Sequence, residues 1–90
     1  MNTLQRPKLY QLIIDIKYFD LDTFEEFPSI ELNKHDKWYR REYNRYGFVV
    51  YQEYSNGKWE RAEYNTRGYQ TYFEDSEGKI VNKKDQYVFN

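Results

Sequence analysis

A pattern of Tyr, Asn, Gly, Tyr, Glu, Ser, Gly and Lys is written twice in this chain of 90 residues, at a spacing of 21 residues. The first copy is YNRYGFVVYQEYSNGKW, at 43–59, and the second is YNTRGYQTYFEDSEGKI, at 64–80. All four glycines of the chain lie in this register. Because glycine adopts positive φ at low cost, their spacing predicts four turns between short strands. The repeat therefore predicts a mainly β fold, an antiparallel β-meander of about five to six strands.

The turns are expected at 44–47, 55–58, 65–68 and 76–79. Gly47 and Gly68 each end a three-residue loop, whereas Asn56-Gly57 is typical of a two-residue type I′ loop that pairs Tyr54 with Trp59. One odd and one even loop in each repeat would keep equivalent residues on the same face of the sheet, despite the odd period.

This register assigns the strand residues to two faces. One predicted face is half aromatic and half charged, and it carries Trp38, Arg40, Glu42, Val50, Gln52, Tyr54, Trp59, Arg61, Glu63, Thr71 and Phe73. The other is the expected core face, and it carries Tyr39, Tyr43, Val49, Tyr51, Ala62, Tyr64 and Tyr72.

The N-terminal part has a different pattern. The segment LYQLIIDIKYF, at 9–19, fits the helical and the strand periodicity about equally, and its three isoleucines and flanking aromatics favour a strand. Asp22 as an N-cap, followed by Glu25 and then by Pro28, predicts one short helix at 23–27.

The whole chain, residues 1–90, is expected to form a single domain. It divides into an N-terminal strand and short helix (1–33), a two-unit β-hairpin repeat (37–84) and a C-terminal tail or edge strand (85–90).

Composition limits the core and the partners. Aromatic residues form 21% of the chain, with 11 Tyr, so tyrosine must supply part of the core of so small a domain. The net charge of −1 lacks the basic excess of most nucleic-acid-binding domains. The chain has no cysteine, no signal-like N-terminus and no apolar stretch that could span a membrane, so a cytoplasmic protein is expected.

The segment GKWERAEYNTRGYQTYFEDSEGK resembles the Tyr-Asp repeats of large bacterial secreted toxins, in which YD or YN is followed two residues on by Gly. It resembles more loosely the membrane-occupation repeats of the form G-K-x-x-G. The resemblance covers residues 37–84, with two units rather than many and with Asn44 and Asn65 where Asp is usual. It implies a stack of β-hairpins that serves as a binding or scaffolding module.

No pattern indicates catalysis or a cofactor. The single histidine, His35, lies in the polar segment NKHDK and is expected to be a solvated loop residue without a nucleophile beside it. The acidic segment DLDTFEE, at 20–26, lacks the central Gly and the ligand spacing of a calcium loop. We therefore expect a protein that is not an enzyme and needs no metal and no cofactor.

The candidate partner-binding residues are Trp38, Arg40, Tyr54, Trp59, Arg61 and Phe73. Trp, Tyr and Arg are the residue types enriched as anchors of protein interfaces. The same set could stack the bases of single-stranded nucleic acid, but carboxylates on the same predicted face would repel phosphates. A third possibility is that Leu12, Ile14 and Ile16 cover this face.

Size and composition fit a non-enzymatic inhibitor or adaptor, such as a phage or mobile-element protein acting on a host defence or nuclease complex. Its expected partner is a protein rather than a membrane. The alternative is a single-stranded nucleic-acid-binding sheet that uses aromatic stacking. Partner identity and oligomeric state stay open.

Overall fold

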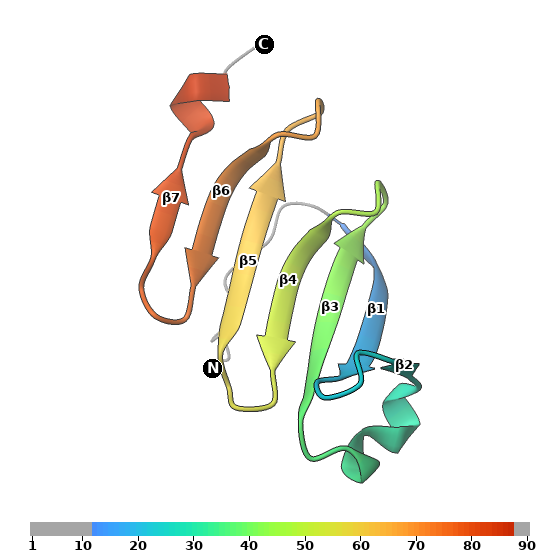
Figure 1. Cartoon of the computed structure of the whole chain (residues 1–90). Helices are drawn as coiled ribbons and strands as arrows, with labels where there is room; N and C mark the ends of the chain where they lie inside the picture. Colours follow the sequence, from blue (N-terminus) through green and yellow to red (C-terminus); the bar gives the residue numbers. More distant parts are fainter. Residues whose placement is uncertain (1–11, 88–90) are drawn as a thin grey trace, which may run out of the picture.

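The computed structural model of the protein describes residues 12–87, which form one antiparallel sheet of seven strands (Figure 1). The strand order is β2-β1-β3-β4-β5-β6-β7, so the five strands from β3 onward follow the chain. The elements are β1 (Ile13–Asp20), β2 (Glu26–Phe27), the 3₁₀ helix η1 (Ser29–Lys34), β3 (Trp38–Asn44), β4 (Val49–Tyr54), β5 (Trp59–Tyr64), β6 (Gln70–Asp75), β7 (Ile80–Asn82) and the 3₁₀ helix η2 (Lys84–Tyr87). The predicted mainly β meander is confirmed, with more strands than expected.

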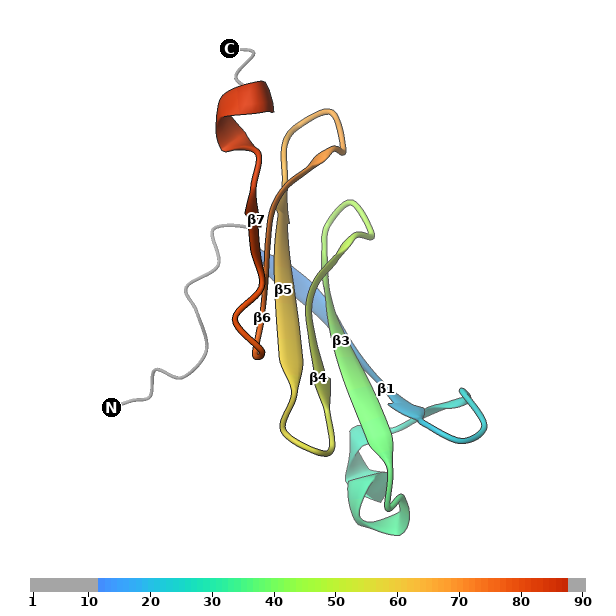
Figure 2. The ribbon, with the colours of Figure 1, turned by 60° about the vertical axis from the view of Figure 1, so that its left-hand side comes forward.

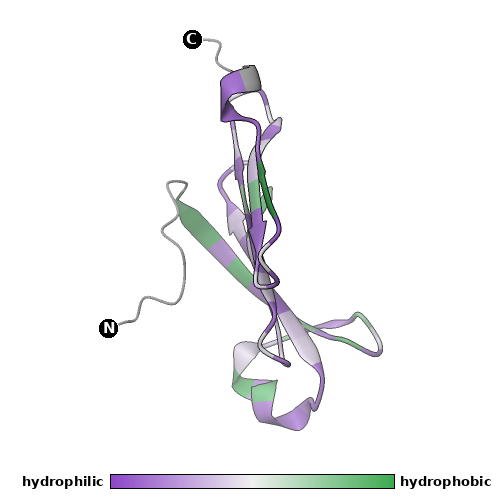
Figure 3. Cartoon of the chain, turned by 90° about the vertical axis from the view of Figure 1, so that its left-hand side faces the viewer, coloured by the Kyte–Doolittle hydropathy of each residue, from purple (hydrophilic) through white to green (hydrophobic). Residues whose placement is uncertain are grey.

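The sheet is a single layer. Seen close to its edge, it is thin and twisted, and none of the described elements forms a second layer over it (Figures 2 and 3). The buried hydrophobic residues among those described are few: Phe27, Tyr39, Val50, Tyr51 and Ala62. Two of these five are tyrosines, so tyrosine contributes to the core as expected.

The start of β1 does not cover the sheet. Ile16 pairs with Glu42 of β3, so β1 extends the same layer. Leu12, Ile14 and Ile16 are exposed, and this hydrophobic stretch stands out in Figure 3. The third possibility, that these residues cover the predicted face of Trp38, is therefore wrong.

All four glycine turns have the same geometry. In each, the glycine N–H donates to the carbonyl three residues earlier, and φ at the glycine lies between 87° and 92°. The Tyr54 N–H donates to the Lys58 carbonyl at 2.8 Å, which closes a three-residue loop around Gly57. The predicted two-residue loop at Asn56-Gly57 is wrong, and Trp59 pairs with Glu53 rather than with Tyr54.

The repeat has an odd period of 21 residues, so each repeat needs one extra residue if equivalent residues are to lie on the same face. A β-bulge in β4 and another in β6 supply that residue. Glu42 pairs with Tyr51 and Tyr43 pairs with Val49, so Val50 is a β-bulge without a partner of its own. Its counterpart one repeat later is Thr71. Each bulge shifts the alternation of faces by one residue, so residues 51–54 of β4 and 72–75 of β6 lie on the opposite face from the predicted one, whereas Val49 lies on the predicted face.

The ends of the chain differ from the prediction in part. The strand in β1 is confirmed for the described residues, and residues 9–11 of the predicted segment lie outside them. The helix predicted at 23–27 is wrong, because this segment contains the end of a turn and the short strand β2, and helical structure begins only after Pro28.

Asp22 is not an N-cap. The turn before β2 is instead held by Asp20 Oδ1, which accepts hydrogen bonds from the N–H groups of Asp22 and Thr23. Near the other end of the chain, the edge strand is β7, and the start of the predicted tail lies in η2. Residues 1–11 and 88–90 lie outside the described part.

Candidate functional site

The structure divides the six predicted partner-binding residues between the two faces of the sheet. Trp38, Arg40, Trp59 and Arg61 share one face, as predicted, because the bulges preserve the equivalence of the repeats. Tyr54 and Phe73 lie on the opposite face, where they pair with Tyr39 and Ala62. We call the first the ion-pair face and the second the hollow face.

The ion-pair face carries a network of side chains around Arg40. The Arg40 guanidinium lies 2.8 Å from Glu42 and 3.5 Å from Glu53. The Tyr51 hydroxyl donates to Glu53 at 3.2 Å, and its ring lies beneath the guanidinium, 5.7 Å away. Glu42 is fully buried. Burial disfavours the charged form of Arg40, but Glu42 and Glu53 outweigh this effect and raise its pKa.

The second repeat builds the same network. Arg61 donates to Glu63 at 2.8 Å and to Glu74 at 3.2 Å, and it lies 4.7 Å from the Tyr72 ring. The Tyr72 hydroxyl donates to Glu74, as Tyr51 does to Glu53. Lys84 adds an ion pair with Glu63 at 2.8 Å. The repeated Arg, Glu and Tyr positions therefore encode a structural network.

The two tryptophans also have equivalent main-chain contacts. The main-chain N–H of Trp38 donates to the Ser55 hydroxyl, and the main-chain N–H of Trp59 donates to the Ser76 hydroxyl. The Trp59 ring stacks on Tyr51 at 6.3 Å, and both indoles are only partly exposed. The main-chain contacts explain why Ser55 and Ser76 repeat, whereas the two indole rings have different neighbours, since the Trp38 ring lies 6.0 Å from Tyr18.

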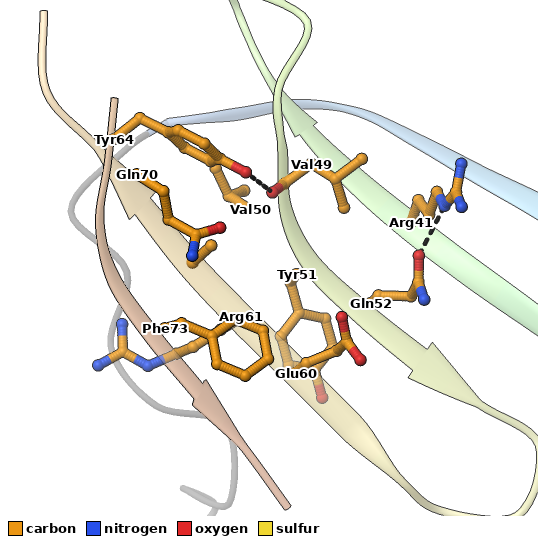
Figure 4. A pocket seen from close by; sticks show the side chains of 11 residues that line it. Arg41, Val49, Val50, Tyr51, Gln52, Glu60, Arg61, Tyr64, Gln70 and Phe73 are labelled. Atoms are coloured by element: carbon orange, nitrogen blue, oxygen red, sulfur yellow. Dashed lines mark hydrogen bonds between the residues drawn. The ribbon is translucent and has the colours of Figure 1, made fainter. Parts of the chain in front are cut away.

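The hollow face has a cavity of about 320 Å³ over β4, β5 and β6. Figure 4 shows side chains of Gln52, Tyr64, Gln70 and Phe73 around it. Its floor includes Ala62, and the residue at the corresponding position one repeat earlier is Arg41. A small side chain in place of a long one therefore opens the hollow.

Aromatic contacts hold one side of the hollow face. Tyr39 stacks on Phe19 at 5.0 Å and lies 6.0 Å from Tyr54. The Arg41 guanidinium lies 5.2 Å from the Tyr39 ring, while its Nε donates to the Gln52 side chain at 2.6 Å. This side is therefore a preformed surface of rings and polar groups.

The opposite side of the hollow is also fixed. The Tyr64 hydroxyl donates to the Val49 carbonyl at 3.3 Å, and its ring stacks on Phe48 at 4.8 Å. Burial raises the pKa of Tyr64. Sequence reasoning missed the hollow because it assigned Ala62 to a core face. The change from Arg41 to Ala62 between otherwise similar repeats was the available signal.

His35 belongs to a structural contact rather than a solvated loop, so that expectation is wrong. Its ring stacks on Phe27 at 3.8 Å, and its Nδ1 lies 2.6 Å from Asp20 Oδ2. Within the described residues, no group of three or more His, Cys, Asp or Glu side chains could hold a metal ion. No helix in this part of the chain is long and apolar enough to cross a membrane.

Acidification is expected to weaken the fold through Asp20. Hydrogen bonds from His35 and from the Thr23 and Asp22 main chain lower the pKa of Asp20 from 3.8 to about 2. A lowered pKa in the folded state stabilises the protein above the ordinary pKa, and this contribution is lost as the pH falls from there toward about 2. Urea denaturation across this window should show a smaller loss of stability for Asp20→Asn than for wild type. Parallel pH profiles would contradict this role.

No family model, curated protein or solved structure matches the chain. The resemblance of residues 37–84 to Tyr-Asp and membrane-occupation repeats therefore stays a prediction.

Proposed function

We propose that the protein is a non-enzymatic protein-binding module and that the hollow face is its binding surface. The observation that carries this proposal is the cavity over Ala62, bordered by Tyr64 and Phe73 and continuous with the Arg41–Gln52 pair. This concave surface is more polar than apolar and has aromatic rings at its border, so it suits an inserted partner side chain that makes hydrogen bonds. Of the six sequence candidates, Tyr54 and Phe73 remain in this surface.

Electrostatics favour a protein partner over nucleic acid on both faces. Arg40 and Arg61 are each held by two carboxylates, so their charge is largely neutralised locally. On the hollow face, Glu60 lines the cavity and pairs across the strands with Asp75. These carboxylates oppose the phosphate contacts on which nucleic-acid affinity depends.

The biological role that we propose is that of a cytoplasmic inhibitor or adaptor, such as a phage or mobile-element protein directed against a host defence or nuclease complex. Support for it comes from the small size, the absence of cysteine and the near-neutral charge of the chain. In this role the protein acts by occupying a surface of its target and uses no cofactor.

Photocrosslinking followed by affinity measurement tests the binding surface. A photoreactive residue at position 70, on the rim of the hollow, should capture the partner, whereas one at position 80, on the ion-pair face, should not. With the captured protein purified, Ala62→Arg should weaken binding at least tenfold, as expected when an anchor pocket is filled. Ile80→Ala is the matched control, because Ile80 is exposed and lies on the other face.

Ala62→Arg is chosen because β3 accommodates arginine at the equivalent position, Arg41. An unchanged melting temperature would show that the variant keeps the fold. Full affinity of a folded Ala62→Arg variant, or capture from position 80 alone, would contradict the assignment of this face.

A further inference from the structure

A second cavity lies between two glycine turns and adjoins the hollow at Tyr64. The turns at 44–48 and 65–69 lie at the same end of the sheet (Figure 1). Between them is a cleft of about 210 Å³, lined by Asn44, Tyr46, Phe48, Tyr64, Asn65 and Thr66. The Phe48 ring lies against Gly68 of the neighbouring turn, so the two turns are in contact. The cleft is therefore a feature of paired repeats rather than of one hairpin.

The end of the sheet that holds the cleft is basic. Segments 43–50 and 64–71 contain Arg45 and Arg67 and no carboxylate. The turns at the opposite end, 55–58 and 76–79, contain Lys58, Lys79 and one carboxylate, Glu77, and most acidic residues at that end lie in the segment at 20–26. The two turns beside the cleft are therefore locally basic although the chain is nearly neutral, and they attract anions.

Aromatic surface is exposed at the same place. Tyr46 is 65% exposed and Tyr69 is 49% exposed. The Arg45 guanidinium lies 5.3 Å from the Tyr46 ring, which places a cation beside a wall of the cleft. Asn65 Nδ2, a buried donor of a lining residue, has no hydrogen-bond acceptor among the described residues. The cleft therefore combines ring faces and positive charge.

We infer that this cleft binds a nucleobase together with its phosphate, with the base stacked against Tyr46 and Phe48 and the phosphate near Arg45 and Arg67. A planar anionic ligand uses both properties of the site, since every base can stack on an aromatic ring and every phosphate is attracted by arginine. The ligand is either a free mononucleotide or a nucleotide of a single strand. This site shares Tyr64 with the border of the protein-binding surface over Ala62, but its proposed ligand contacts lie on other residues.

Fluorescence anisotropy of full-length protein tests the inference with two probes. One is a fluorescein-labelled oligothymidylate, and uridine monophosphate is added as a competitor. We expect the labelled strand to bind at low salt, Tyr46→Ala to weaken it about tenfold through loss of stacking, and Arg67→Gln to reduce the slope of log affinity against log salt by about one. Lys58→Gln is the matched control, because Lys58 is an exposed turn cation at the other end of the sheet.

The two sources of the ligand are distinguished by competition. Displacement of the strand by uridine monophosphate at similar concentration identifies a mononucleotide site, and displacement only by unlabelled strand identifies single-stranded nucleic acid. Absence of strand binding at low salt would overturn the inference, as would equal losses for Arg67→Gln and Lys58→Gln. The proposed ligand contacts do not include Ala62, and the two proposals are tested on different residues with different ligands, so failure here and failure of the protein-binding proposal are distinguishable.

Discussion

Replacing Arg40 by Met is expected to lower the free energy of unfolding by about 3 kcal/mol, near the low end of the range for breaking a buried ion pair. Glu42 has no exposed surface, and the Arg40 guanidinium lies 2.8 Å from its carboxylate. Methionine keeps much of the volume of the arginine stem but supplies no charge. Because small domains are stable by only about 5–15 kcal/mol, a loss of this size is readily measured by urea denaturation.

A double-mutant cycle separates the ion pair from the packing of the side chains. Glu42→Gln should also destabilise the protein, and the Arg40→Met, Glu42→Gln double variant should be more stable than the sum of the single losses predicts, by about 2 kcal/mol. Additive losses would show that the two side chains act independently, against the network described for the ion-pair face.

Valine at position 68 is expected to destabilise the protein more than valine at the equivalent position 47. Both glycines have φ of 87°, so a β-branched residue at either position should cost about 1–3 kcal/mol in backbone strain. At Gly68 an added Cβ would also lie 3.3 Å from Phe48 Cζ, whereas at Gly47 nothing lies within 4 Å. Displacing the Phe48 ring should add about 1 kcal/mol or more.

Thermal denaturation of the two variants and wild type measures the difference. The pair is internally controlled, since both positions share the turn geometry and differ in their surroundings. Equal melting temperatures for the two variants would mean that the Phe48 contact does not constrain the neighbouring turn. A wild-type melting temperature for Gly47→Val would contradict the strain at positive φ.

The repeat was sufficient to predict the sheet and its turns, because glycine spacing reflects a backbone requirement that is local in sequence. It was insufficient for the faces of β4 and β6. Asn56-Gly57 is typical of a two-residue loop, but Tyr54-x-x-Gly57 has the same spacing as Asn44-x-x-Gly47, and that common spacing indicated the common three-residue turn. The bulge at Val50 has no comparable marker, since neither Val49 nor Val50 is a special backbone residue.

Sequence spacing predicted which strand residues share a face for β3 and β5, but it did not predict the hollow face. Trp38, Arg40, Trp59 and Arg61 share a face because they lie on β3 and β5, whose equivalence follows from the repeat alone. Tyr54 and Phe73 lie on strands whose faces depend on the bulges, so sequence spacing placed them wrongly. The hollow required knowledge of which side chains border Ala62, which only the strand register supplies.

The bulges at Val50 and Thr71 also determine which insertions and deletions of repeat units the sheet can accept. Because each 21-residue unit contains one odd step, a duplicated unit inserted between the hairpins would repeat the orientation of its neighbours and continue the Arg and Glu rows in phase. A unit one residue shorter would place the next tryptophan and arginine on the hollow face instead of the ion-pair face. The architecture therefore permits the number of 21-residue units to vary, whereas a single-residue insertion or deletion inside a unit would place the residues after it on the wrong face.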